Sequence, residues 1–214
     1  ALLERLLGEP TGTGFDRICA EAYLRLGAEG KGQALVERRL AAARSGLSPE
    51  AVYVLCSFAE AFVRLDRVER AIPLVEEAAR MPRVLDPLRT AERHLDLAGA
   101  YAAVRRPADA RLQLDLARDE QLLHALDLDG RVDHLARVAA SLRENLDEVL
   151  AARETFTRAM ALERQLYPGT DDYYAGVYAR IAADLGLSDE VERRLPRVAP
   201  DEVGSVLGAL VAAS

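Results

Sequence analysis

Residues 59–78 read AEAFVRLDRVERAIPLVEEA, and residues 98–117 read AGAYAAVRRPADARLQLDLA. The two stretches carry small and apolar residues at the same internal offsets. These are Ala59, Phe62, Ala71, Val75 and Ala78 in the first stretch, and Ala98, Tyr101, Ala110, Leu114 and Ala117 in the second. Because spacings of three and four residues place side chains on one face of a helix, each stretch predicts two helices separated by a short break.

Weaker copies of the same pattern occur on both sides of these stretches. One has an extra residue between its two helices: Ala139 and Leu142, then Ala152, Phe156 and Ala159. Another comprises Ala20, Tyr23, Ala34 and Ala41, and a final one comprises Ala182 and Leu185. A self-similar period of this length is typical of stacked repeats. It predicts about five helix pairs, with residues 200–213 left over.

The small residues have a physical explanation in helix packing. Two antiparallel helices approach closely only where one presents a side chain no larger than a methyl group, with large neighbours filling the adjacent gap. We therefore expect Ala59 against Ala71 and Ala98 against Ala110. Because a single pair leaves one face unburied, the pairs should stack into a solenoid, and residues 200–213 would form a helix that covers the last pair.

These residues resemble the tetratricopeptide repeat family, whose pattern has a small residue and an aromatic on the first helix and alanine, a large residue and alanine on the second. Ala59 to Ala78 with Pro82 is the best match, and the resemblance covers residues 15–195. The repeats are longer than the family's usual 34 residues. In this they are similar to the repeats of kinesin light chains and some bacterial regulators, most clearly in residues 156–162 and 166–169.

The resemblance implies an all-α fold: a right-handed α-solenoid of about five antiparallel helix pairs, a superhelix with a C-terminal capping helix. The expected single domain spans residues 1–214, with repeats at 15–45, 48–82, 87–120, 129–167 and 171–197 and the capping helix at 200–213. Helix starts are predicted by capping motifs: Ser48-Pro49-Glu50, Asp86-Pro87, Thr170-Asp171-Asp172 and Ser188-Asp189-Glu190.

Composition narrows the function classes. A net charge of −7 disfavours direct binding to nucleic acid, which needs a basic surface. No apolar run approaches the roughly 20 residues of a membrane span. Cys19 and Cys56 lie far apart in expected helices, so we interpret them as buried core residues of a protein in a reducing compartment, which predicts a cytoplasmic location. Lys31 is the only lysine, and this bias toward arginine suits a GC-rich bacterial genome.

Residues that carry chemistry are sparse. No two of His94, His124 and His134 have the i, i+4 spacing of helical metal ligands, so no metal or cofactor is expected. His94 falls at a packing position. The segment 127–130 lacks the spacing of a calcium loop and is interpreted as a solvated turn, and the glycine-rich segment 8–14 lacks the lysine of a phosphate loop and is interpreted as a linker. No nucleophile, base and orienting group can be assembled, so an enzyme is not expected.

The candidate binding residues are those that the repeat frame places on the groove-facing side of the first helices. They are Arg17, Arg25, Tyr53, Glu60, Arg64 and Arg143. Arginines favour an acidic or carboxylate-bearing partner, because the guanidinium group binds carboxylates bidentately. Glutamates at positions 21, 60, 92 and 144 line the same faces, so intramolecular ion pairs are the alternative interpretation.

Two functions remain open. The first is a protein–protein interaction scaffold that holds a peptide or helix of a partner in its concave groove. The second is the sensor or oligomerisation domain of a bacterial transcriptional regulator whose DNA-binding part lies outside this segment. Helix-forming sequence from residue 1 onward, with no initial methionine, favours a domain trimmed from a longer protein. Self-association is left open.

Overall fold

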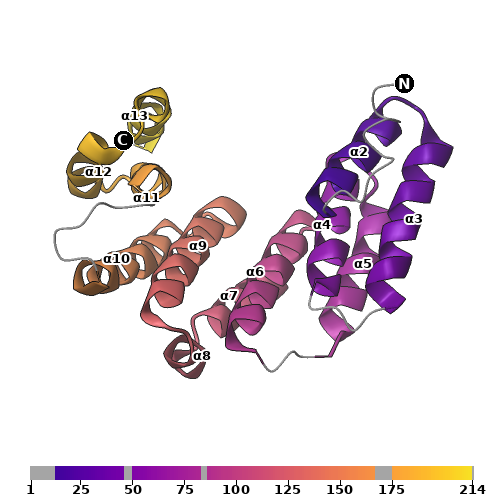
Figure 1. Ribbon diagram of the computed structural model, residues 1–214, viewed down its shortest axis with the longest axis horizontal. Helices are drawn as coiled ribbons and strands as arrows, with labels where there is room; N and C mark the ends of the chain where they lie inside the picture. The colour runs from indigo at the N-terminus through magenta and orange to yellow at the C-terminus, as the bar shows by residue number, and fades with distance from the viewer. Residues whose placement is uncertain (1–12, 46–49, 83–85, 167–174, 214) are drawn as a thin grey trace. The chain divides into compact units, whose positions relative to one another are not determined.

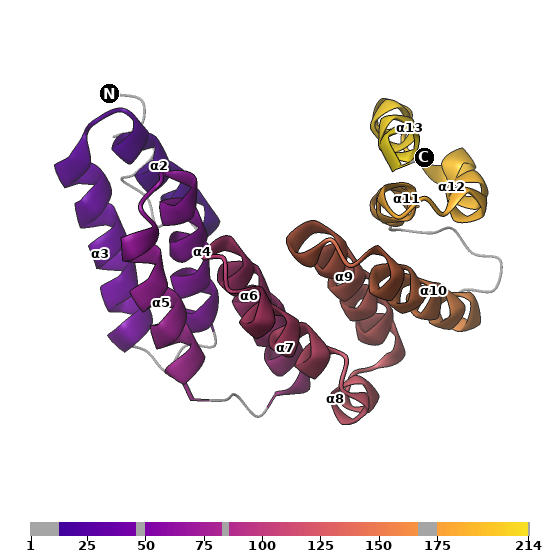
Figure 2. The ribbon, with the colours of Figure 1, turned by 180° about the vertical axis from the view of Figure 1, so that it is seen from behind.

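The computed structural model describes residues 13–45, 50–82, 86–166 and 175–213, with side chains from residue 18 onward (Figures 1 and 2). These residues form twelve α-helices and one 3-10 turn and contain no strand, so the described chain is all-α, as predicted. It divides into an N-terminal unit, residues 1–113, and a C-terminal unit, residues 114–214. Each unit has its own packed interior.

The N-terminal unit contains α2 to α6 and most of α7. Their bounds are α2 Thr13–Arg25, α3 Glu29–Ser45, α4 Ala51–Arg64, α5 Val68–Arg80, α6 Pro87–Ala103 and α7 Pro107–Ala117. The sequence favours helix here through alanine, leucine, arginine and glutamate. The capping prediction for Asp86 is confirmed, since its carboxylate accepts from the N–H of Arg89 at 2.8 Å ahead of Pro87.

The C-terminal unit contains the end of α7 and the helices that follow. These are α8 Glu120–Ala125, α9 Leu128–Leu146, α10 Val149–Leu166, α11 Ala175–Asp184, α12 Ser188–Arg194 and α13 Pro200–Ala213, with the 3-10 turn η1 at Leu195–Arg197. Helix α8 was not predicted. Helix α13 occupies the residues expected for a terminal helix, packs on α11 and buries Val206.

A single turn geometry recurs after five helices. Every positive-φ residue of the described chain lies at one of these turns: Gly27, Asp66, Arg105, Asp147 and Gly186. The N–H of the next residue then returns to a carbonyl in the last helical turn: Ala28 to Tyr23, Arg67 to Phe62, Arg106 to Tyr101, Glu148 to Leu142 and Leu187 to Ala182, at 2.8 to 3.0 Å. This is a Schellman closure, which satisfies carbonyls that the helix end leaves open. The turn after α9 is one residue longer, which confirms the extra residue predicted there.

In the two best copies of the predicted pattern, and in the copy at residues 139–159, the small residues lie in the core. Ala59, Ala71, Ala98 and Ala110 have no exposed surface, and neither do Ala139 and Ala152. Helix α4 packs on α5, and α9 packs on α10. Larger residues of the pattern, among them Phe62, Leu114 and Phe156, are also buried and fill the space beside the alanines.

Two copies of the pattern were assigned incorrectly. Ala34 and Ala41 are exposed on α3, whereas Gly32, Val36 and Ala43 are buried. Gly32 is therefore the close-approach residue of that pair, twelve positions after Ala20, as Ala71 is after Ala59. In the last copy the recurring turn aligns Ala182 with Phe62, which makes Ala179 the counterpart of Ala59 instead of Ala182. Ala182 and Leu185 are nevertheless both buried.

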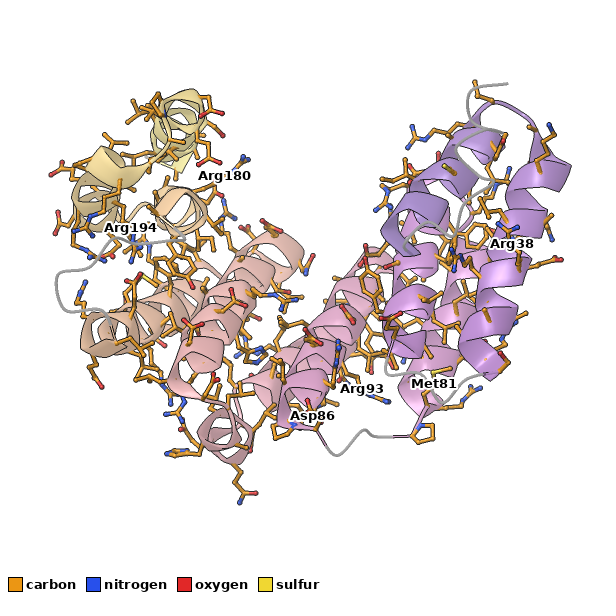
Figure 3. All side chains as sticks on the ribbon, in the orientation of Figure 1. Arg38, Met81, Asp86, Arg93, Arg180 and Arg194 are labelled. Carbon is orange, nitrogen blue, oxygen red and sulfur yellow. The ribbon has the colours of Figure 1, made fainter. Side chains whose placement is uncertain are left out.

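Side chains of two helices cap carbonyls at the end of an earlier helix. Arg93 of α6 donates to the carbonyls of Ala79 and Pro82 at 3.0 Å and of Ala78 at 3.3 Å, at the end of α5 (Figure 3). His134 of α9 is bonded through Nε2 to the carbonyl of Ala117 at 2.8 Å, at the end of α7. Arg93 and His134 stand at the same place, five residues before Ala98 and Ala139. Consecutive pairs are thus joined by a shared polar contact that the sequence did not reveal.

Candidate functional site

The first helices α2, α4 and α6 of the N-terminal unit pack in sequence order, α2 against α4 and α4 against α6. This brings three of the predicted binding residues together. Arg25 donates to Glu21 at 2.8 Å, and Arg64 of α4 reaches the same carboxylate at 3.3 Å. Arg64 also lies 3.9 Å from Glu60. We call Glu21, Arg25, Glu60 and Arg64 the α2–α4 charge cluster.

The cluster continues toward α6 through a close approach at Gly99. A Cβ built on Gly99 would lie 3.1 Å from Oε1 of Glu60, so the missing side chain leaves room for this carboxylate. Burial by itself would raise the pKa of Glu21, but the hydrogen bonds from Arg25 and Arg64 outweigh burial and lower it. Glu21 is therefore ionised near neutral pH and holds both arginines.

The other predicted residues lie in different settings. Tyr53 is 41% exposed on α4 and presents an aromatic surface to solvent on the helix that carries Arg64. Arg143 belongs to α9 in the C-terminal unit and pairs with Asp147. Arg17 falls within α2, but its side chain lies outside the described residues. The structure therefore brings together Arg25, Glu60 and Arg64, with Tyr53 on the same helix.

The structure shows the surroundings of both cysteines and of two of the histidines. Cys19 and Cys56 are buried and form no disulfide, which confirms their interpretation as core residues, and burial raises the pKa of the Cys56 thiol well above its usual range. His94 is half-buried, with Nδ1 2.8 Å from Oε1 of Gln113. His124 lies at the exposed end of α8. Among the residues with described side chains, no group of histidine, cysteine and acidic side chains could hold a metal ion.

Two predictions about helix starts are wrong. Segment 127–130 is not a free turn, because Asp127 caps α9 by accepting from the N–H of Gly130 at 2.7 Å. Ser188 is the first residue of α12 rather than its cap, and the capping position falls on Leu187 without a side-chain bond. Helix α4 begins at Ala51, and the proposed motif at 48–49 lies outside the described residues, as does 170–172.

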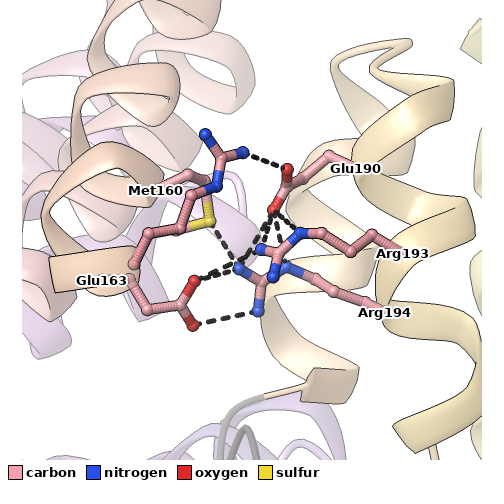
Figure 4. A network of polar contacts seen from close by, with 6 residues as sticks. Met160, Glu163, Glu190, Arg193 and Arg194 are labelled. Carbon is pink, nitrogen blue, oxygen red and sulfur yellow. Dashed lines mark hydrogen bonds and ion pairs between the residues drawn. The ribbon is translucent and has the colours of Figure 1, made fainter. Parts of the chain in front are cut away.

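A second polar cluster, which the sequence did not predict, joins α10 to α12 (Figure 4). Arg194 has a completely buried side chain and donates to Glu163 at 3.1 Å, to Glu190 at 3.1 Å and to Sδ of Met160 at 2.8 Å. Its guanidinium group also stands 5.1 Å from the ring centre of Tyr178. Burial lowers the pKa of Arg194, and the charge of Glu163 opposes that effect. This arginine links α10, α11 and α12.

Comparison with protein-family models, with curated proteins and with solved structures gave no match. Among the described helices, none combines the length and the apolar character needed to cross a membrane.

Proposed function

We propose that this chain is a protein–protein interaction scaffold of the tetratricopeptide kind, without enzymatic activity, in a bacterial cytoplasm. In this proposal about five antiparallel helix pairs form a right-handed α-solenoid, and α13 covers the last pair. Two repeated features support it. The Schellman turn recurs within the helix pairs, and the contacts of Arg93 and His134 recur between one pair and the next.

The observation that carries the binding proposal is the α2–α4 charge cluster, together with the exposed Tyr53 on the helix that carries Arg64. Arg64 is 41% exposed and shares Glu21 with Arg25, so its guanidinium group keeps donors for a partner. Exposed ion pairs of this kind contribute only about 0 to 1 kcal/mol, so an incoming carboxylate can exchange with them. Tyr53 adds aromatic contact area, and tyrosine and arginine are both enriched at binding hot spots. The proposed partner is an acidic or carboxylate-bearing peptide or helix.

Selection from a random peptide library displayed on phage tests this proposal. The selected peptides should be acidic, and Arg64→Glu should weaken their binding at least about tenfold, or about 1.4 kcal/mol, because it replaces attraction by repulsion. Arg80→Glu is the matched control: Arg80 also pairs with a glutamate four residues earlier, Glu76, but lies on the second helix α5. Equal loss in both variants, or selection of peptides without acidic residues, would refute the role of the cluster.

The alternative function, a sensor or oligomerisation domain of a transcriptional regulator, is favoured by one observation. The C-terminal unit contains a cavity of about 380 Å³ between α10 and the start of α12. A cavity of that size can admit a small-molecule signal. Sequence adjoining this segment that encodes a basic helix-turn-helix would support the regulator, and its absence from the full-length protein would count against it.

A further inference from the structure

The cavity beside α12 has an apolar floor. Phe156 and Met160 of α10, which lie at its base, are 0% and 2% exposed, and the half-buried Leu187 completes the lining. Its volume of about 380 Å³ is at the lower end of the roughly 300 to 1,000 Å³ of small-molecule sites. It can therefore admit a small molecule such as an acylated amino acid.

Leu187 departs from the equivalent residues of other turns. The recurring Schellman turn places a charged residue at this position after three other helices: Arg67, Arg106 and Glu148. Here the position carries a leucine, next to Gly186, where an added Cβ would come 2.7 Å from a nitrogen of Arg153. This turn therefore contributes an apolar side chain to the cavity, where three of the other four turns carry a half-buried charged residue.

One arginine lines this cavity. Arg164 is 56% exposed and donates to Glu190 at 2.9 Å. Glu190 also accepts from Arg193 and from Arg194, so it keeps cationic partners when Arg164 turns away (Figure 4). Thr157 and Ser188 also line the cavity, and each carries a hydroxyl that can donate a hydrogen bond.

We propose that this cavity binds a monocarboxylate with an apolar body. The apolar body would contact Phe156, Met160 and Leu187, and the carboxylate would pair with Arg164. A guanidinium group recognises a carboxylate through two parallel N–H bonds, which gives the ligand a fixed orientation. Asp189 and Glu190, which also line the cavity, oppose any negative charge that Arg164 does not neutralise, so a ligand with one carboxylate is favoured over one with two. The ligand is either a small carboxylic acid or the C-terminal residue of a peptide.

Methyl NMR tests this directly, because the chain has two methionines. Met160 forms the floor of the cavity, and Met81 at the end of α5 is an internal reference in the other unit. N-acetyl-leucine should shift the Met160 methyl signal saturably and leave the Met81 signal unchanged. N-acetyl-leucine amide, which lacks the charge, should bind at least about tenfold more weakly. A hexapeptide ending in a free leucine carboxylate identifies the source: binding tighter than that of N-acetyl-leucine assigns the site to chain termini, and equal binding assigns it to small acids.

Arg164→Gln should reduce the affinity for N-acetyl-leucine about tenfold while the Met160 signal of the ligand-free protein stays in place. Arg137→Gln is the control, since Arg137 is an exposed arginine of α9 paired with Asp133 outside the cavity. The proposal is overturned if neither the acid nor the peptide shifts Met160, if the amide binds as well as the acid, or if Arg164→Gln binds like the parent.

Discussion

Gly32 of α3 lies against Leu24 of α2 so closely that an added Cβ would stand 2.7 Å from Cγ of Leu24 and 3.2 Å from the carbonyl oxygen of Ala20. The helices of this pair therefore meet at a residue smaller than the alanines that serve the other pairs. Any side chain at this position requires Leu24 or one of the two helices to shift. This contact follows the rule that small residues set helix approach.

Gly32→Ala should destabilise the protein, although the same change inside a helix ordinarily stabilises it by about 0.5 to 1 kcal/mol. The added methyl group must push Leu24 aside or separate the two helices. Gly30→Ala in the same helix is the control, because nothing lies within 4 Å of its added Cβ, and it should be neutral or slightly stabilising. Urea denaturation of both variants measures the difference, and the close approach is disproved if Gly32→Ala is as stable as Gly30→Ala.

A charged residue at a buried alanine should cost far more. Ala110 has no exposed surface in α7, so Ala110→Glu both overpacks the helix contact and buries a carboxylate, at a cost on the order of 3 kcal/mol or more. Ala108→Glu, two residues earlier on the exposed side of α7, should cost under about 0.5 kcal/mol. Thermal melts followed by circular dichroism compare the two. Equal melting temperatures would show that the assigned register is wrong.

The sequence predicted the helical class because three- and four-residue spacing is a local signal. The register of a helix pair was harder to predict where the residue at the helix contact adds nothing to the apolar pattern. Gly32 has no apolar side chain, so the alanines at 34 and 41 appeared to be the contact residues although both are exposed. Helix α11 has the opposite difficulty: several alanines are buried, among them Ala179 and Ala182, and more than one register fits the pattern.

The polar clusters depend on contacts between residues distant in sequence. The bonds from Arg93 to Ala78 and from Arg194 to Glu163 join residues 15 and 31 positions apart, which no periodicity reveals. Arg25, Glu60 and Arg64 were placed together because the repeat frame aligns the first helices. That frame did not show that Glu21 holds two of these side chains at once.

The ion pair between Arg44 of α3 and Glu77 of α5 should make stability depend on pH. Two hydrogen bonds of 2.6 and 2.7 Å join the groups, and the bond from Arg44 holds the pKa of Glu77 below its ordinary value of 4.5. Because the pKa is lower in the folded state, the contribution is fully present above pH 4.5 and is lost as the pH falls through the folded value.

Glu77→Gln should therefore be less stable than the parent at pH 7, by up to about 1 kcal/mol for so exposed a pair, and the difference should shrink toward pH 3. Glu37→Gln is the control, because Glu37 bonds the neutral Gln33 and should show a smaller difference that changes less with pH. Urea titrations at a series of pH values give both curves. A difference between parent and Glu77→Gln that stays constant from pH 7 to pH 3 would contradict the linkage.

Arg194 should be the most sensitive charged residue of the C-terminal unit. Its side chain is wholly buried, and Glu163, only 9% exposed, depends on it for compensation. Arg194→Met removes the cation and leaves that carboxylate nearly buried, which costs about 3 to 5 kcal/mol when one partner of a buried pair is lost. Arg193→Met is the matched control: Arg193 contacts the same two glutamates but is 37% exposed, so its loss should cost about 1 kcal/mol or less.

The double variant Arg194→Met with Glu163→Met separates the charge from the packing. Replacing both partners by apolar residues removes the uncompensated carboxylate, so the double variant should be more stable than Arg194→Met alone. Urea denaturation of the parent, both single variants and the double variant gives the coupling free energy. If the double variant is instead the least stable of the set, the two residues contribute separately, and Arg194 stabilises the unit through its contacts with Met160 and Tyr178 rather than by compensating Glu163.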